Sequence, residues 1–155
     1  MKKFIFCLFT IFICAGLFAQ QQGAAESSGT EEAAANTGYN IGDRGPGGGF
    51  VFFAENGAYL ECSADIGTFN WNRSVREVKN YRGGDFTDWR LPTRAELDLI
   101  YQNLKKTNTG GFSNDRYWSS AEYLVESAWN QNFGSGKQDY SYKTISIKVL
   151  AVRAF

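Results

Sequence analysis

The 155-residue chain contains no histidine, and this absence removes several kinds of chemistry at once. Serine and cysteine nucleophiles need an adjacent base, most often an imidazole, to take up their proton. The Ser119-Ser120 pair therefore does not indicate a serine hydrolase. Glu122 and Glu126 are two carboxylates among 16 acidic residues, so they do not predict a glycosidase. The composition favours a protein that is not an enzyme.

Cysteine is also scarce, and two of the three cysteines lie in the first 19 residues. A basic start at Lys2 and Lys3 precedes an apolar run over 4–18, which is shorter than the roughly 20 residues of a membrane-spanning helix. We predict a signal peptide over 1–19, cleaved near Ala19. Lipid attachment at Cys14 is a less favoured alternative, and an uncleaved membrane anchor is another.

Residues 20–38 are rich in Gln, Ala, Ser, Gly and Thr and hold three glutamates but no basic residue. Such a segment buries too little apolar surface to offset its ordering entropy, so we predict a flexible tether. One domain is expected over 39–155. Its predicted location is secreted, periplasmic or at the cell surface, with no transmembrane segment once the signal peptide is removed.

The predicted domain has little net charge and one thiol. Of 16 basic and 16 acidic residues in the chain, the leader takes two and the tether three, so 39–155 is nearly neutral. A nucleic-acid partner, which needs a broad basic face, is not expected. Cys62 cannot form an internal disulfide, and it is predicted to be buried and inert, with an intermolecular bridge as the alternative.

The pattern along the domain alternates between strand and helix signals. The apolar run 50–54, the Asn56-Gly57 turn and the run 59–64 predict a β-hairpin. A helix is predicted over 73–81, ended by Gly83-Gly84. The next is expected to begin at Thr93, where Thr93 and Glu96 can form a capping box. Its apolar stripe is formed by Leu97, Ile100, Tyr101 and Leu104.

Strands return in the last third of the chain. Residues 117–120, 128–133 and 138–143 are predicted strands, and 144–155 is predicted as one long strand. Because apolar residues occupy both of its faces after Val149, we place that strand centrally in its sheet. Strands, then helices, then strands predict an α+β domain.

Five segments in a fixed order carry a resemblance to a known family. They are a Gly-Pro-Gly-Gly turn entering the strand at 45–53, Asp-Trp-Arg-Leu-Pro-Thr at 88–93, Tyr-Trp-Ser-Ser at 117–120, Ala-Trp-x-x-Asn-Phe at 128–133 and a closing strand at 148–153. In these segments the chain resembles the DUF1566 family, also called the Lcl C-terminal domain after a collagen-like adhesin. The similarity covers nearly all of 39–155.

The resemblance implies a C-type-lectin-like fold: a mixed, mainly antiparallel sheet with two helices and long loops. It also implies that the first and last strands pair, which would place 39–41 beside the C-terminal strand and leave a loop-bearing end on the opposite side. More distantly, the family is similar to formylglycine-generating enzymes, but their catalytic cysteine pair is missing here. The calcium loops of true C-type lectins are missing too, so no metal or cofactor is expected.

The tryptophan motifs have a structural interpretation. Trp89 is expected to fill the core while Arg90 ties down a loop, and Trp118 and Trp129 are likewise expected in the core. The remaining polar surface is built from Ser, Asn, Tyr and Gly, a composition typical of adaptable binding surfaces. The candidate ligand-binding residues, all expected to be exposed, are Asn114, Arg116, Tyr123, Asn130, Asn132, Lys137, Asp139, Tyr140 and Tyr142.

These observations favour a non-catalytic, adhesin-like binding module that recognises an extracellular glycan or protein. The adhesin resemblance makes a sulfated polysaccharide one candidate, with Lys137, Lys143 and Lys148 as contacts. The alternatives are a structural envelope protein and, less favoured, a degenerate enzyme of the formylglycine-generating type. Clustering of Tyr123 with the other two candidate tyrosines at the loop-bearing end would support binding, and their burial would oppose it.

Overall fold

Two sheets and two helices make up the part of the chain that the computed structural model describes, residues 38–155. The predicted signal peptide and all of the predicted tether except Gly38 lie outside these residues. Eight mostly antiparallel strands and two α-helices in 38–155 confirm the α+β class. In chain order the elements are β1 (Phe50–Glu55), β2 (Ala58–Cys62), β3 (Gly67–Phe69), α1 (Trp71–Asn80), η1 (Gly83–Asp85), α2 (Arg94–Ile100), η2 (Tyr101–Lys105), β4 (Arg116–Leu124), β5 (Ser127–Asn132), β6 (Gln138–Tyr142), β7 (Ile147–Val149) and β8 (Val152–Ala154).

The smaller sheet has the order β1-β2-β8 and contains the predicted hairpin. Asn56 and Gly57 both have positive φ, which is the backbone of a tight hairpin turn whose twist matches the flanking strands. The last strand pairs with β2, not with β1, so the expected pairing of first and last strands is wrong. The ends of the domain are nonetheless neighbours, because the Tyr39 and Phe155 ring centroids lie 5.0 Å apart.

The larger sheet has the order β3-β7-β4-β5-β6, with β7 inside it as predicted, but β8, which follows Val149, is an edge strand of the smaller sheet, so the central placement is wrong for that part. The segment 144–155 is not one strand, however. It is divided into β7 in the larger sheet and β8 in the smaller one, with Leu150 and Ala151 between them. Both of these residues are fully buried, and they point into different core clusters. The chain therefore crosses from one sheet to the other through the middle of the protein.

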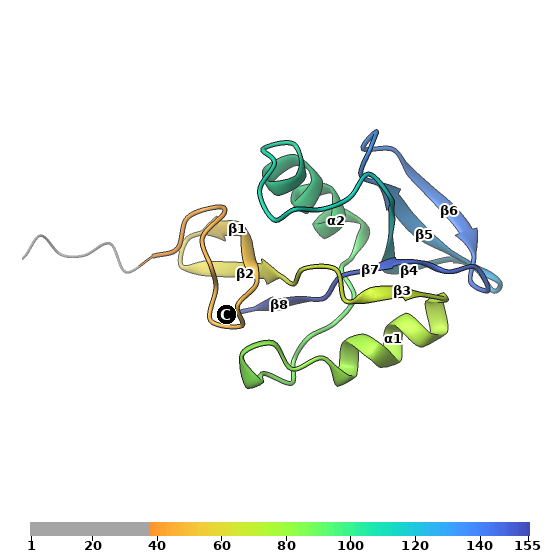
Figure 1. Ribbon diagram of the computed structural model, residues 1–155, viewed down its shortest axis with the longest axis horizontal. Helices are drawn as coiled ribbons and strands as arrows, with labels where there is room; N and C mark the ends of the chain where they lie inside the picture. Colours follow the sequence, from red (N-terminus) through yellow and green to blue (C-terminus); the bar gives the residue numbers. More distant parts are fainter. Residues whose placement is uncertain (1–37) are drawn as a thin grey trace, which may run out of the picture. The chain divides into compact units, whose positions relative to one another are not determined.

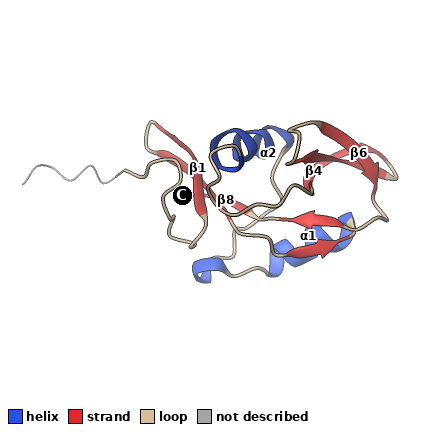
Figure 2. Ribbon diagram, turned by 45° about the horizontal axis from the view of Figure 1, so that its top comes forward, coloured by secondary structure: helices blue, strands red, loops and turns tan. Residues whose placement is uncertain are grey.

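The helices cover opposite faces of the larger sheet (Figures 1 and 2). On the α2 side, Leu97, Ile100 and Leu104 pack against Tyr117 and Phe133. On the α1 side the core includes Val78, Trp118, Ala128 and Val149. Neighbouring residues of a strand point to opposite faces, which is why Tyr117 and Trp118 belong to different clusters.

The helix boundaries follow from their capping residues. α1 begins earlier than predicted because the side chain of Asn70 accepts a hydrogen bond from the Arg73 amide. It ends at Asn80 with an extended Tyr81, and the predicted glycine stop instead forms the short turn η1. The capping box of Thr93 and Glu96 at the start of α2 is present as predicted.

Candidate binding surface

The glycine-rich turn at 45–49 surrounds a buried carboxylate that sequence reasoning did not identify. Glu61 is fully buried, and its side chain accepts hydrogen bonds from the amides of Gly47 and Gly49 at 2.9 and 3.0 Å. Its charge is met by Arg153, whose Nη1 lies 2.8 Å from Glu61 Oε1. A Cβ on Gly45, Gly47 or Gly49 would lie within 3.1 Å of the Glu61 side chain, so only glycine permits this close approach.

The motif at 88–93 is bonded to the same arginine, Arg153, and has the structural role predicted for it. Asp88 accepts a second bond from Arg153 at 2.8 Å, and this hydrogen bond holds the pKa of the Asp88 carboxyl below its usual range. Trp89 is buried, and its indole N–H donates to the Gly83 carbonyl at 3.1 Å. Arg90 donates two bonds to Glu96, at 2.6 and 2.7 Å, which fastens the loop to the first turn of α2.

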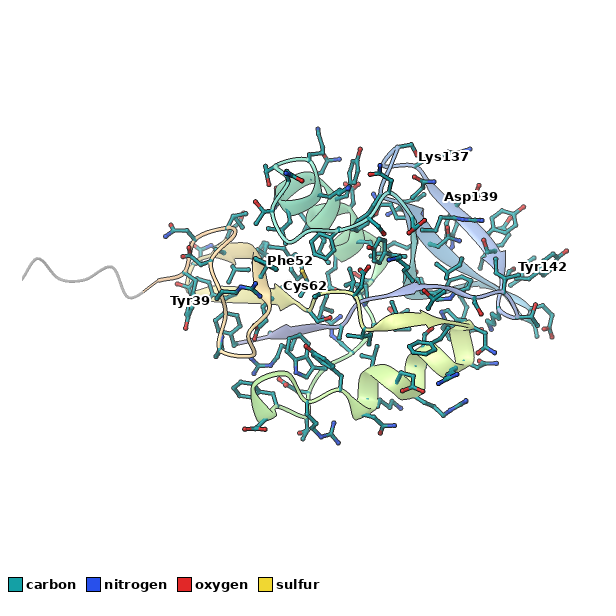
Figure 3. All side chains as sticks on the ribbon, viewed as in Figure 1. Tyr39, Phe52, Cys62, Lys137, Asp139 and Tyr142 are labelled. Carbon is teal, nitrogen blue, oxygen red and sulfur yellow. The ribbon has the colours of Figure 1, made fainter. Side chains whose placement is uncertain are left out.

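Cys62 lies beside Glu61 at the end of β2, fully buried and with no disulfide partner. Burial raises the pKa of its thiol, because a thiolate has no solvation in the core. The predicted buried thiol is confirmed. Figure 3 shows Cys62 in the interior near Phe52, on the side of the molecule that carries Tyr39.

The end of the larger sheet farthest from Glu61 carries exposed apolar side chains instead of buried polar ones. Its exposed side chains include Tyr123, Tyr140 and Tyr142, with 43%, 49% and 71% of their surface accessible, together with Leu124 at the end of β4 and Val125 in the turn that follows. We call these five residues the tyrosine tip. Figure 3 places Tyr142 at the end of the domain opposite Tyr39, and Tyr123 and Tyr140 line the same groove as Tyr142, so the three tyrosines are exposed and gathered at that end.

The tip is ordered by a stack of aromatic rings across three strands. The Tyr123 and Tyr140 rings are stacked with centroids 4.1 Å apart. Both meet Trp129 nearly at right angles, at 5.3 and 6.1 Å. The Arg94 guanidinium, at the start of α2, lies 3.5 Å from the centroid of the Trp129 ring. Trp129 is only half-buried, so its predicted place in the core is wrong; it supports the tyrosines instead.

A groove of about 320 Å³ runs along this end of the sheet. Three tyrosines, two serines and one leucine line it: Tyr123, Leu124, Ser127, Tyr140, Ser141 and Tyr142. Tyr140 pairs with Trp129 and Tyr142 with Ser127 in the β5–β6 register, which brings these side chains to one face. The groove therefore offers flat apolar surfaces next to hydrogen-bonding groups.

The other candidate residues do not all join the tip. Asn130 is 1% exposed, which contradicts its predicted exposure. It lies on the α1 side of β5, where its amide donates to Ser141 Oγ at 3.0 Å while Arg116 donates to the same oxygen at 3.2 Å. Its own Oδ1 is buried and has no hydrogen-bond partner within residues 38–155. Neighbouring residues of a strand point to opposite faces, so Asn130 and Trp129 lie on different sides of the sheet, and the side of Asn130 is covered.

The remaining candidates lie nearer the β5–β6 turn. Asn132 is partly buried, and its side chain accepts bonds from the Gly134 and Ser135 amides, so it shapes the turn. Asn114, Arg116, Lys137 and Asp139 are exposed, as predicted. Figure 3 shows Lys137 and Asp139 along β6, with Tyr142 at its end. The exposed candidates are therefore spread over β4, β6 and the loops next to these strands, whereas Asn130 on β5 is buried.

Two of the three lysines considered for sulfate contacts are already paired. Lys143 Nζ lies 2.6 Å from Glu122, and most of its side chain is buried. Lys148 Nζ lies 2.7 Å from Asp65, whose hydrogen bond raises the pKa of the lysine. Of the three, only Lys137 takes part in no ion pair with another residue of 38–155. Lys143 and Lys148 could therefore contact a sulfate group only by sharing or leaving their acidic partners.

None of the helices in 38–155 has the length and apolar character that crossing a bilayer requires. Nor do three or more acidic, cysteine or histidine side chains of those residues meet in a way that could hold a metal ion.

Comparison with known proteins assigns the family. The Lcl C-terminal domain matches residues 55–153, which include the buried Glu61–Arg153 pair, the motif at 88–93 and the tyrosine tip. The chain belongs to the Lcl C-terminal domain family. No curated protein matches it at a significant level. In this Lcl C-terminal domain, the motifs at 45–49 and 88–93 make contacts that stabilise the fold. The exposed tyrosines lie outside these motifs.

Proposed function

We propose that this Lcl C-terminal domain is a non-catalytic, extracytoplasmic binding module, and that it contacts a polysaccharide through the tyrosine tip. One observation carries the proposal. Five of the seven large apolar side chains exposed in residues 38–155 belong to the tip, and Ile145 lies on the following loop. A protein surface seldom concentrates apolar groups at one end unless that end meets a partner.

The chemistry of the groove favours a sugar chain as the ligand. A pyranose ring has an apolar face that stacks on an aromatic ring, and hydroxyl groups around its rim. The Tyr123–Tyr140 stack supplies the flat surface, and Ser127 and the phenol groups of the exposed tyrosines supply hydroxyls in the same groove. Because Lys143 and Lys148 are paired with acids, we expect stacking to contribute more than sulfate binding.

The non-catalytic part of the proposal rests on the state of Cys62. A thiol that reacts as a nucleophile must be accessible and must ionise, whereas burial shields Cys62 and raises its pKa. The extracytoplasmic part rests on the leader pattern at 1–19, with its basic start and apolar run.

The experiment is retention of the full mature chain on a panel of immobilised neutral and sulfated polysaccharides, at low and high salt. We expect binding that survives high salt and weakens by about tenfold or more when Tyr123 and Tyr140 are both replaced by Ala. Tyr39→Ala, which removes a tyrosine from the opposite end, is the matched control and should bind normally. Failure of every polysaccharide to bind would reject the proposed ligand.

A protein ligand is the second candidate, because Leu124 and Val125 are exposed at the β4–β5 turn. Aliphatic side chains contribute little to sugar stacking but are common anchors at protein interfaces. Crosslinking in intact cells that captures one abundant envelope protein, and is lost in Leu124→Ser/Val125→Ser but kept in Tyr123→Ala/Tyr140→Ala, would favour this candidate.

A further inference from the structure

A second cavity, of about 400 Å³, lies between α1 and the segment 89–93, and shares no lining residue with the groove of the tyrosine tip. One side is formed by Trp71, Val75 and Lys79 of α1. These residues are spaced four apart, so they follow one stripe along the helix. The volume is within the range of small-molecule sites in proteins.

The cavity presents aromatic surface without free indole donors. Trp71 and Trp89 both line it, together with Leu91. The Trp71 indole N–H already donates to the Ser119 carbonyl at 2.8 Å, and that of Trp89 donates to Gly83. With both polar atoms engaged inside the protein, the two indoles offer the cavity only apolar contact.

The charge around the cavity is positive. Its lining contains Lys79 and Arg90 but no acidic residue. The Arg90 charge is balanced by Glu96, and the nearby Lys143, whose Nζ lies 4.8 Å from the Trp71 ring, is balanced by Glu122. Lys79 forms no ion pair with any other residue of 38–155. The unbalanced charge at the cavity is therefore one ammonium group.

We infer that this cavity is a binding site for a small organic anion with a single apolar ring. The ring lies against Trp71 and Trp89, and its carboxylate or sulfonate faces Lys79. Aromatic walls by themselves would also suit a cation, but the unbalanced Lys79 ammonium group in the lining repels one. The hydroxyls of Thr93 and Ser120 complete the polar part of the lining.

The indole N–H signals of the four tryptophans give a site-resolved test in a two-dimensional NMR spectrum of the full mature chain. We would titrate the protein with benzoate and, separately, with the uncharged benzamide. We expect the Trp71 and Trp89 signals to shift with benzoate at millimolar concentration, since a one-ring ligand makes few contacts. The Trp118 and Trp129 signals should stay in place.

Three variants sharpen the result. Lys79→Gln should weaken benzoate binding by about tenfold and leave benzamide binding unchanged. Arg76→Gln, on the exposed face of the same helix, is the matched control. Ser120→Tyr places a ring in the cavity from an exposed strand position and should abolish binding of both probes. Shifts of Trp129 alone, equal affinity for benzoate and benzamide, or equal behaviour of the Gln variants would each overturn the inference.

Discussion

At the end of the domain that holds Tyr39 and Phe155, the Glu61 and Arg153 side chains are buried and bonded to each other. At the opposite end, three tyrosines are exposed at the surface. Charge is inside at one end, and apolar surface is outside at the other. A buried charge survives only when its partners are in place, so the first arrangement concerns folding. The exposed rings lie outside the buried core clusters, so the second arrangement is the one on which the proposed binding function depends.

Breaking the buried pair is expected to have the largest effect on stability. In Arg153→Ala, Glu61 keeps its two amide bonds but loses its counter-charge in the core. We expect the free energy of unfolding to fall by about 3–5 kcal/mol, measured by urea denaturation. Arg73→Ala, which removes a surface pair with Glu77, should cost under about 1 kcal/mol. A similar small loss in both variants would remove the contrast between the two ends.

Substitutions in the glycine-rich turn at 45–49 test the packing around Glu61 without changing any charge. A Cβ at position 47 would lie 2.5 Å from Trp89 Cζ2 and 2.7 Å from Glu61 Oε1. We expect Gly47→Ala to cost about 3 kcal/mol, the upper end of overpacking penalties. Gly48→Ala meets no atom within 4 Å and only has to adopt a positive φ of 76°, which should cost about 1 kcal/mol. Thermal denaturation of the two variants side by side would show whether the close approach matters more than the backbone.

The tyrosine tip should tolerate changes that the other end does not. Tyr140→Ala removes a stacked ring that is half-exposed, so we expect a loss of about 1 kcal/mol. The thermal unfolding curve of Tyr140→Ala should stay cooperative. A loss as large as that of Arg153→Ala would instead place the stack among the elements that hold the fold.

The smallest effect is a dependence on pH at Asp88. The bond from Arg153 lowers the pKa of Asp88 in the folded state. Its contribution to stability is therefore fully present above the unfolded-state pKa of about 3.9 and is lost as the pH falls through the lower folded-state pKa. Asp88→Asn should show a shallower loss of stability below about pH 4 than the unmodified protein. Equal acid unfolding profiles would show that this bond adds nothing.

Local patterns in the sequence predicted the elements that are determined locally. The Asn56-Gly57 hairpin and the Thr93–Glu96 capping box depend on residues only a few positions apart, and both are present. The pairing of β8 with β2, and the break at Leu150 that divides the last strand between two sheets, depend on contacts between distant segments. Periodicity in one segment contains no information about which sheet will receive it.

The candidate site divides in the same way. The sequence alone marked Tyr123, Tyr140 and Tyr142 as exposed candidates, because they lie in a stretch rich in Ser, Asn and Gly, but the pairing of β4, β5 and β6 decided that they gather at one end. Only the tertiary structure decided that Asn130 is covered, that Trp129 is not, and that Glu61 meets Arg153 across 92 residues of chain. The physical reason is that burial and charge pairing are properties of what packs on a residue, and most of what packs on these residues comes from elsewhere in the chain.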